Sequence, residues 1–138
     1  MKFSKSTNYE EAVKIIKSNM ASDYKKLGLD WDDDSKLTQY KKCVLRDILL
    51  EDEILGFFMV YENAGVYYLA ELHIDDRFRN RGFGTKALAK IKAVASEEGY
   101  SEVRVGAFKD SSALKLYEKN GFNREKETEY THELVATT

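Results

Sequence analysis

The stretch ELHIDDRFRNRGFGTKALAKI, residues 71–91, joins a strand-like run to a helix-like run through a glycine turn. The turn, residues 79–84, has the form R-x-x-G-x-G. Glycines leave room for an approaching anion, and the free N–H groups of a first helical turn point toward it. Arg79 and Arg81 add positive charge, and Thr85 adds a hydroxyl. The stretch therefore predicts an anion-binding turn. The alternative is a plain strand-to-helix turn in which the glycines serve geometry alone.

Three runs upstream of this turn favour β-strands. They are rich in β-branched, aromatic and aliphatic residues, and the short segments LEDE and ENAG between them suit hairpins. The runs are CVLRDILL (43–50), EILGFFMVY (53–61) and VYYLAELHI (66–74). They predict an antiparallel meander, which argues against a dinucleotide-binding turn because that turn requires a parallel βαβ unit.

Apolar residues at helical spacing predict helices on both sides of the meander. The first helix is expected over residues 8–22, opened by Thr7 with Glu10 as a capping box. A shorter helix is expected over residues 35–42. Residues 85–98 carry the apolar stripe of a helix that lies on a sheet, with Gly99 at its end.

The last part of the chain continues this alternation. Residues 101–108 favour a strand, which a β-helix-β connection places parallel to the preceding one. Asp110 or Ser111 can cap one more helix, and residues 122–135 can supply one or two final strands. We therefore predict a mixed α/β sheet in one domain, residues 1–138: an antiparallel meander, then a parallel strand pair with flanking helices.

Charge and composition exclude several function classes. The sequence has 22 basic and 24 acidic residues, a net charge of −2, whereas a general nucleic-acid binder needs a basic surplus. No run approaches the roughly 20 apolar residues of a membrane span, and the first residues lack the apolar core of a signal peptide. One cysteine and two histidines make a poor metal set. A cytoplasmic protein without nucleic acid, membrane or metal is expected.

Two motifs together resemble the GNAT superfamily of acetyl-CoA-dependent N-acetyltransferases. The first is the stretch 71–91. The second is VRVGAFKDSSALKLYEKNGF, residues 103–122, which ends in A-x-x-x-Y-E-K-x-G-F. The resemblance covers residues 43–122, and residues 1–42 match in element order only. It implies an N-acetyltransferase with acetyl-CoA as cosubstrate and no metal.

The resemblance also implies where the coenzyme binds. The strands around residues 72–74 and 103–107 would lie parallel and then splay apart, with the pantetheine arm in the gap and the pyrophosphate on the amides of the glycine turn. Many relatives carry an asparagine where this sequence has residues 109–112, KDSS. The residues assigned to the coenzyme are Leu72, His73, Ile74, Arg79, Arg81, Gly82, Phe83, Gly84, Thr85, Asp110, Ser111 and Tyr117.

Two residues are candidates for proton transfer. Tyr117 matches the family's tyrosine that protonates the departing thiolate; the alternative is a core tyrosine. Glu71 lies inside an apolar strand, where a carboxylate is costly unless it is paired or faces a cleft. It is our candidate base, and an ion-paired or exposed glutamate is the alternative. Strand alternation predicts Leu69, Glu71 and His73 on one face, with Ala70, Leu72 and Ile74 on the other.

The acceptor amine is expected near Trp31, Tyr130 and His132, because the corresponding regions border the acceptor cleft in the family. Asp30 and residues 32–34 surround Trp31 and would suit an ammonium group, although a solvated acidic loop that Trp31 anchors is the favoured explanation. The acceptor is expected to be a small-molecule or peptide amine, and a homodimer stays open. Two other functions also stay open: a non-catalytic acyl-CoA-binding module and a phosphate-binding domain of another fold.

Overall fold

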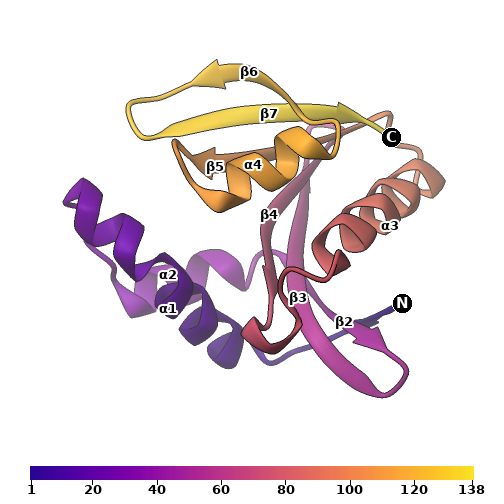
Figure 1. Cartoon of the computed structure of the whole chain (residues 1–138), viewed down its shortest axis with the longest axis horizontal. Coiled ribbons are helices and arrows are strands. Elements are labelled where there is room, and N and C mark those ends of the chain that lie inside the picture. Colours follow the sequence, from indigo (N-terminus) through magenta and orange to yellow (C-terminus); the bar gives the residue numbers. More distant parts are fainter.

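The computed structural model describes residues 1–138 as one seven-stranded sheet with helices on both faces (Figure 1). The strand order is β1-β2-β3-β4-β5-β7-β6, and β4 with β5 is the parallel pair. The predicted mixed α/β sheet is confirmed. The elements are β1 (Lys2–Lys5), α1 (Tyr9–Leu27), α2 (Asp33–Tyr40), β2 (Val44–Leu50), β3 (Glu53–Asn63), β4 (Val66–Ile74), the 3-10 helix η1 (Asp76–Phe78), α3 (Phe83–Glu97), β5 (Glu102–Phe108), α4 (Ser112–Lys119), β6 (Asn123–Glu127) and β7 (Thr131–Thr137).

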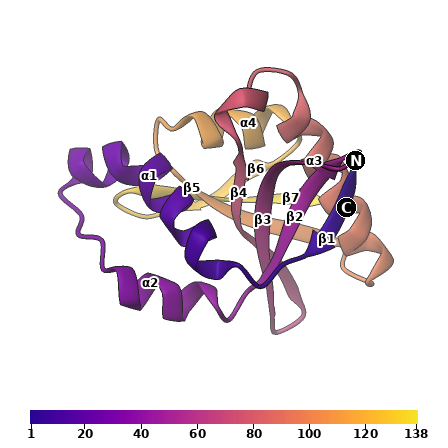
Figure 2. The same cartoon turned by 90° about the horizontal axis from the view of Figure 1, so that it is seen from below.

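Two hydrophobic clusters hold the helices against the sheet. The larger cluster packs α3 and α4 on one face, through residues such as Leu88, Ile91 and Leu114. The smaller cluster packs α1 and α2 on the other face, through Ile16 and Tyr40. Figure 2, viewed from below, shows α1 and α2 on one side of β4 and α3 and α4 on the other.

The parallel strands β4 and β5 pair over three residues and then separate. The paired positions are residues 67–69 of β4 and 103–105 of β5. Beyond Leu69, β4 continues to Ile74 and β5 continues to Phe108 without pairing to each other. Figure 1 shows the two strands diverging from this point. The predicted splay is therefore present, and the residues expected in it, 72–74, lie in its open part.

A β-bulge at Ala70 changes which side chains of β4 share a face. Glu71 pairs with Met59 while Leu69 pairs with Val60, so Ala70 is the extra residue. Leu69 belongs to the larger cluster, whereas Ala70 packs against the smaller one. The expected common face for Leu69 and Glu71 is wrong, because the extra residue reverses the alternation between them.

Three element boundaries differ from the sequence prediction. The strand β1 was not expected, and it pairs with β2. The helix α1 runs to Leu27 rather than residue 22, and the capping box at Thr7 does not form, since Asn8 is the N-cap and no side chain caps it. The helix α2 begins at Asp33 because the Asp32 carboxylate accepts a hydrogen bond from the Ser35 N–H at 3.0 Å.

The later helix signals are confirmed. Gly99 follows α3 with a φ of 93°, and the Ser111 hydroxyl caps α4 by accepting from the Leu114 N–H at 3.1 Å. The tail forms two strands, β6 and β7. None of the helices combines the length and the apolar composition that crossing a membrane requires.

Candidate active site

The glycine turn leaves a row of backbone N–H groups without partners. The helix α3 begins at Phe83, and Gly82 before it is left-handed with a φ of 81°. Lys86 donates its N–H to the Gly82 carbonyl at 3.1 Å, but residues 81–85 donate theirs to no protein carbonyl, and no side chain caps the helix. Unpaired N–H groups at a helix N-terminus favour an anion. The site can therefore hold a phosphate group.

The turn is fixed against the end of α4. A Cβ atom at Gly84 would lie 3.2 Å from the Leu116 Cδ2 atom, so the turn packs closely on this helix. Asn120, at the end of α4, donates from Nδ2 to the Thr85 hydroxyl at 3.2 Å. These contacts hold the unpaired amides in one position.

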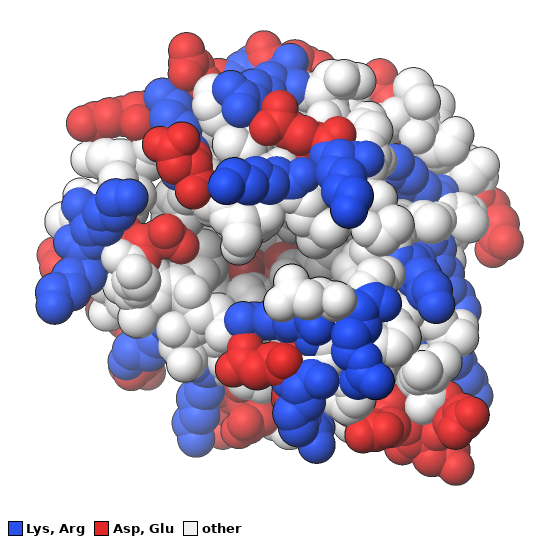
Figure 3. All heavy atoms as spheres, in the orientation of Figure 1, with Lys and Arg blue, Asp and Glu red and all other residues white.

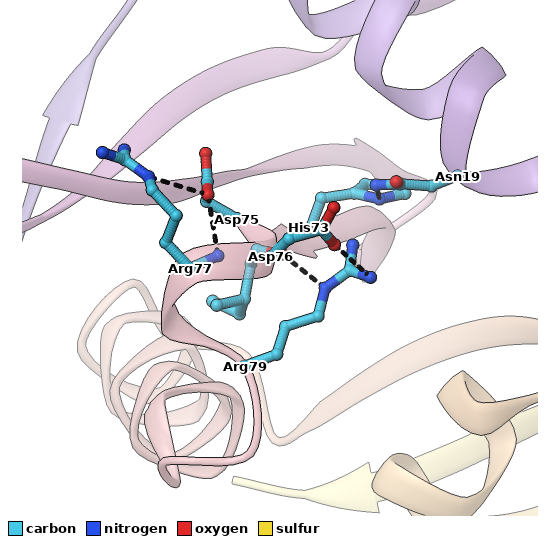
Figure 4. Close-up of polar contacts among 7 residues, drawn as sticks. Asn19, His73, Asp75, Asp76, Arg77 and Arg79 are labelled. Carbon is cyan, nitrogen blue, oxygen red and sulfur yellow. Dashed lines mark hydrogen bonds and ion pairs between the residues drawn. The ribbon is translucent and has the colours of Figure 1, made fainter.

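The two arginines of the turn differ in their partners. Arg79 donates from Nε to the Ile74 carbonyl at 2.9 Å and pairs through Nη1 with Asp76 at 2.6 Å (Figure 4). Arg81 pairs with no carboxylate and lies near the faces of the Phe78 and Phe83 rings, 5.9 Å from each centroid. Arg81 therefore keeps its charge available to an anion, while Arg79 ties the turn to the end of β4.

The open part of β4 presents backbone groups toward β5. The Asp75 N–H donates to the Leu55 carbonyl at 2.8 Å, so this residue points its backbone toward β3. Since successive residues of a strand point to opposite neighbours, Leu72 and Ile74 point theirs into the gap. This edge can bind an extended ligand as an added strand would.

Glu71 accepts hydrogen bonds on both carboxylate oxygens. The Tyr40 hydroxyl donates to Oε2 at 2.9 Å, and His73 Nε2 lies 2.7 Å from Oε1. Asn19 Nδ2 lies 2.9 Å from His73 Nδ1, as Figure 4 shows. With this amide nitrogen as donor, His73 carries its proton on Nε2 and donates it to Glu71. The Glu71 side chain is only 13% exposed.

Tyr40 and Asn19 were missed by the sequence reasoning. Tyr40 ends α2 and Asn19 lies in the middle of α1, both far from Glu71 along the chain. Neither belongs to a motif. Only the packing of these two helices on the sheet brings the side chains to β4.

Tyr117 is buried on α4 but its hydroxyl has no protein partner. Its ring packs against Phe122, 5.5 Å between centroids. No fully buried side-chain oxygen or nitrogen lacks a hydrogen bond, so this hydroxyl still reaches solvent. Burial and then the Glu71 charge raise the pKa of Tyr117. Tyr117 is therefore protonated at neutral pH and lies within the electrostatic reach of Glu71.

The gap and its surroundings form a hollow in the molecular surface. Figure 3, in the orientation of Figure 1, shows this hollow with acidic atoms in its depth and Lys and Arg side chains along its rim. The Glu71 charge also contributes, after burial, to the raised pKa of Cys43 and of Tyr40. The Cys43 thiol is therefore kept protonated, which makes it a poor nucleophile.

Trp31 lies in an aromatic cluster at the end of α1. Its ring is 5.3 Å from that of Tyr24, which in turn is 5.8 Å from the Phe108 ring at the end of β5. Two of the neighbouring carboxylates have structural partners, since Asp32 caps α2 and Asp33 pairs with Lys17 at 3.0 Å. The acidic loop is thus partly explained by local structure.

Tyr130 and His132 lie near the end of β5, which the aromatic cluster of Trp31 also reaches through Phe108. The Tyr130 carbonyl accepts from the Lys109 N–H at 2.9 Å. His132 pairs with Ala107, a member of the larger cluster, so it faces α4, whereas Trp31 packs against the smaller cluster. His132 and Trp31 therefore lie on opposite faces of the sheet.

Asp110 and Ser111 form the turn between β5 and α4. Asp110 is left-handed, with a φ of 61°, and exposed. The Ser111 hydroxyl is occupied as the cap of α4. Across the whole chain, no three His, Cys, Asp or Glu side chains are grouped so that they could hold a metal ion.

Comparisons with known proteins agree with this geometry. The sequence model of the acetyltransferase (GNAT) family matches residues 10–122. The chain therefore belongs to the GNAT acetyltransferase family. No curated protein matches the sequence significantly.

Three of the solved structures that share this fold illustrate the likeness. GCN5 from Tetrahymena gives a TM-score of 0.75 at 13% identity, covering 99% of this chain and 96% of that one. The ribosomal-protein-S18-alanine N-acetyltransferase from Escherichia coli gives 0.73 at 15% identity, covering 99% and 92%. A GNAT family acetyltransferase from Elizabethkingia anophelis, solved with acetyl-CoA bound, gives 0.67 at 18% identity, covering 75% and 82%.

Proposed function

We propose that residues 1–138 form one acetyltransferase domain that transfers an acetyl group from acetyl-CoA to a primary amine by direct attack. The observation that carries the proposal is the row of unpaired N–H groups at residues 81–85 beside the open edge of β4. A helix N-terminus suits the pyrophosphate of the coenzyme, and an open strand edge suits its amide-containing pantetheine arm.

The residues of the turn and of β4 would hold the coenzyme. The amides of residues 81–85, the free charge of Arg81 and the Thr85 hydroxyl would bind the pyrophosphate. The backbone groups of Leu72 and the N–H of Ile74 would bind the pantetheine arm, because the Ile74 carbonyl already accepts from Arg79. An N–H near them would stabilise the negative charge on the thioester oxygen. A related fold solved with acetyl-CoA supports this assignment.

Glu71 and Tyr117 would move the protons. Acetyl-CoA supplies an acetyl thioester, whose C–S bond breaks as the amine nitrogen bonds to the carbonyl carbon. Glu71 accepts a proton from the incoming ammonium, which frees the amine lone pair. Tyr117 donates its hydroxyl proton to the leaving sulfur and recovers one, through water, from the new amide nitrogen. Glu71 then releases its proton to solvent. Burial keeps Cys43 protonated, so no acyl-enzyme is needed.

The acceptor amine would enter on the side of the gap where Glu71 is held by Tyr40 and His73. Trp31, whose aromatic cluster reaches Phe108, is the proposed wall of this entrance, with Tyr130 at its other side. An aromatic wall next to a carboxylate suits the ammonium form of a small-molecule or peptide amine.

The activity is tested by thiol release from acetyl-CoA in the presence of a panel of amines: polyamines, amino acids, aminoglycosides and peptides. At least one amine should raise thiol release well above hydrolysis. Tyr117→Phe should then lower kcat ten-fold or more while coenzyme binding, measured by calorimetry, stays unchanged. Tyr61→Phe on β3 is the matched control and should keep full activity. Unchanged turnover in Tyr117→Phe would remove the acid role, and binding without any turnover would indicate a non-catalytic acyl-CoA module.

A further inference from the structure

A pocket of about 370 Å³ lies between the N-terminal half of α1 and the sheet. Its lining includes no residue of the range 80–85 and neither Glu71 nor Tyr117. It occupies the face of the sheet on which α1 packs, whereas the amides of the glycine turn belong to α3 on the other face. The lining does include Ile74 and Arg79 at the end of β4, and Asn19 and His73 of the hydrogen-bond network of Glu71, so the pocket borders the proposed active site.

The pocket has an apolar floor and an apolar rim. The buried ring of Phe57 forms part of the floor and stacks on His73, 5.3 Å between centroids. Ile15 and Ile54 at the rim are 37% and 52% exposed, which makes them two of the five large apolar side chains that the fold leaves open to solvent. Such a surface suits the aliphatic body of a ligand.

The pocket also holds a carboxylate without a partner. Asp47 on β2 is half-buried and makes no hydrogen bond or ion pair with any side chain, and burial raises the pKa of its carboxyl group. It pairs across the sheet with Phe57, which pairs with His73, so the three lie in one row. A half-buried charge without a partner is unfavourable and would be stabilised by a cation.

The other acidic residues of the pocket differ in whether they have an ion-pair partner. Glu11 on α1 is exposed and has no ion-pair partner. Asp75 pairs with Arg77 at 3.1 Å and Asp76 with Arg79, as Figure 4 shows. The net charge that faces the pocket is therefore negative, and its uncompensated part is at Asp47 and Glu11.

We propose that this pocket binds an organic cation with an aliphatic body, the positive charge at Asp47 and the apolar part against Phe57, Ile15 and Ile54. A bare inorganic cation fits the pocket less well because it cannot use the apolar floor. A neutral or anionic aliphatic chain fits less well because it leaves the Asp47 carboxylate without a partner. The proposed contacts of the cation, Asp47, Phe57, Ile15 and Ile54, go beyond the residues proposed for acetyl transfer, and the pocket adjoins those residues through His73.

The probe for this site is hexyltrimethylammonium. It has no N–H group and cannot be acetylated, so its binding is independent of turnover. In a ¹H–¹⁵N NMR titration of the full chain, it should bind saturably and shift amides of residues 11–19, 45–57 and 73–76. Hexanoate and 1-hexanol, with chains of the same length, should bind at least five-fold more weakly.

Two variants test the role of the carboxylate. Asp47→Asn should weaken binding of the probe at least five-fold, and Asp23→Asn should leave it unchanged. Asp23 is the matched control because it is also half-buried and unpaired, but it lies outside the pocket. If Asp47→Asn does not fold, Glu11→Gln on the exposed face of α1 should still weaken binding at least two-fold.

Saturation with coenzyme A should change the affinity for the probe less than two-fold, because the side chains proposed to hold the probe, Asp47, Phe57, Ile15 and Ile54, are not among those proposed to hold the coenzyme. Four results would overturn the proposal. The first is no saturable binding of the probe, and the second is binding to Asp47→Asn as tight as to the unmodified chain (or to Glu11→Gln, if Asp47→Asn does not fold). The third is loss of binding in Asp23→Asn, and the fourth is competition between the probe and coenzyme A. None of these measurements depends on turnover, so the proposed acetyl transfer is tested separately by thiol release.

Discussion

Glu71 is held by hydrogen bonds on both of its carboxylate oxygens. Tyr40 and His73 each donate to one carboxylate oxygen, and Asn19 fixes the proton of His73 on the nitrogen that faces Glu71. The two hydrogen bonds fix the orientation of the Glu71 carboxylate, whose side chain is largely enclosed. An oriented carboxylate of this kind is suited to accept a proton from an ammonium group.

Replacing Glu71 should change the pH dependence of catalysis. Glu71→Gln keeps the size of the side chain but cannot accept the proton of the ammonium form. We expect kcat/KM at pH 7 to fall ten-fold or more, and the deficit to shrink at high pH, where more of the amine is already neutral. The measurement is the pH profile of kcat/KM for the best amine found. Glu97→Gln on the exposed face of α3 is the control, and an unchanged profile for Glu71→Gln would exclude the base role.

The strand β3 carries a glycine that sets how closely it approaches β4. A Cβ atom at Gly56 would lie 2.0 Å from the His73 carbonyl oxygen, which is backbone and cannot rotate away. At Gly106 on β5, the nearest atom to such a Cβ is the His132 carbonyl oxygen at 3.9 Å, an ordinary contact. The two glycines therefore differ in what an added methyl group would cost.

Gly56→Ala should destabilise the protein by about 3 kcal/mol, at the upper end of overpacking effects, because the two strands must move apart. Gly106→Ala, the matched control, should change the free energy of unfolding by less than about 0.5 kcal/mol. Urea denaturation of both variants measures this difference. Equal stabilities would show that β3 and β4 are not packed as closely as described.

Local patterns predicted the glycine turn, a cap for α4 at Asp110 or Ser111, and the order of the elements from α1 onward. They did so because each signal lies within a few residues of its consequence. The bulge at Ala70 has no such signal, since a strand with an extra residue has the same composition as one without. The strand β1 is four residues long and is held by pairing with β2, some 40 residues away.

The candidate site, like the fold, was predictable only where its residues belong to a local sequence motif. Tyr117 and residues 81–85 lie inside local motifs, so the sequence alone could single them out. Tyr40, Asn19 and Asp47 were not identified, because their importance comes from contacts between elements distant in sequence. The expectation that Leu69 and Glu71 share a face was wrong, because the bulge at Ala70 reverses the alternation of side chains between them.

The molecule as a whole buries several tyrosines, which links its stability to alkaline pH. Burial, followed by the charge of Glu98, raises the pKa of Tyr67 from 10.0 to about 12. Between these values the unfolded chain loses a proton that the folded protein keeps. The contribution is therefore fully present below pH 10 and is lost as the pH rises toward 12.

We expect the free energy of unfolding to be flat from pH 8 to 10 and to fall between pH 10 and 12. In Tyr67→Phe the fall should be smaller, because one of the titrating groups is gone. Urea denaturation at a series of pH values measures both curves. A stability that stays flat to pH 12, or a fall of the same size in the variant, would contradict the assignment.

The central claim is that the glycine turn and the open edge of β4 form a coenzyme site, and thermal unfolding with acetyl-CoA tests it most directly. At a concentration about 100 times its Kd, acetyl-CoA should stabilise the fold by about 2.7 kcal/mol, which raises Tm by several degrees. ATP at the same concentration should leave Tm unchanged, since it has phosphates but no pantetheine arm. A rise with acetyl-CoA alone is the predicted result. No rise with acetyl-CoA, or an equal rise with both, would contradict the account.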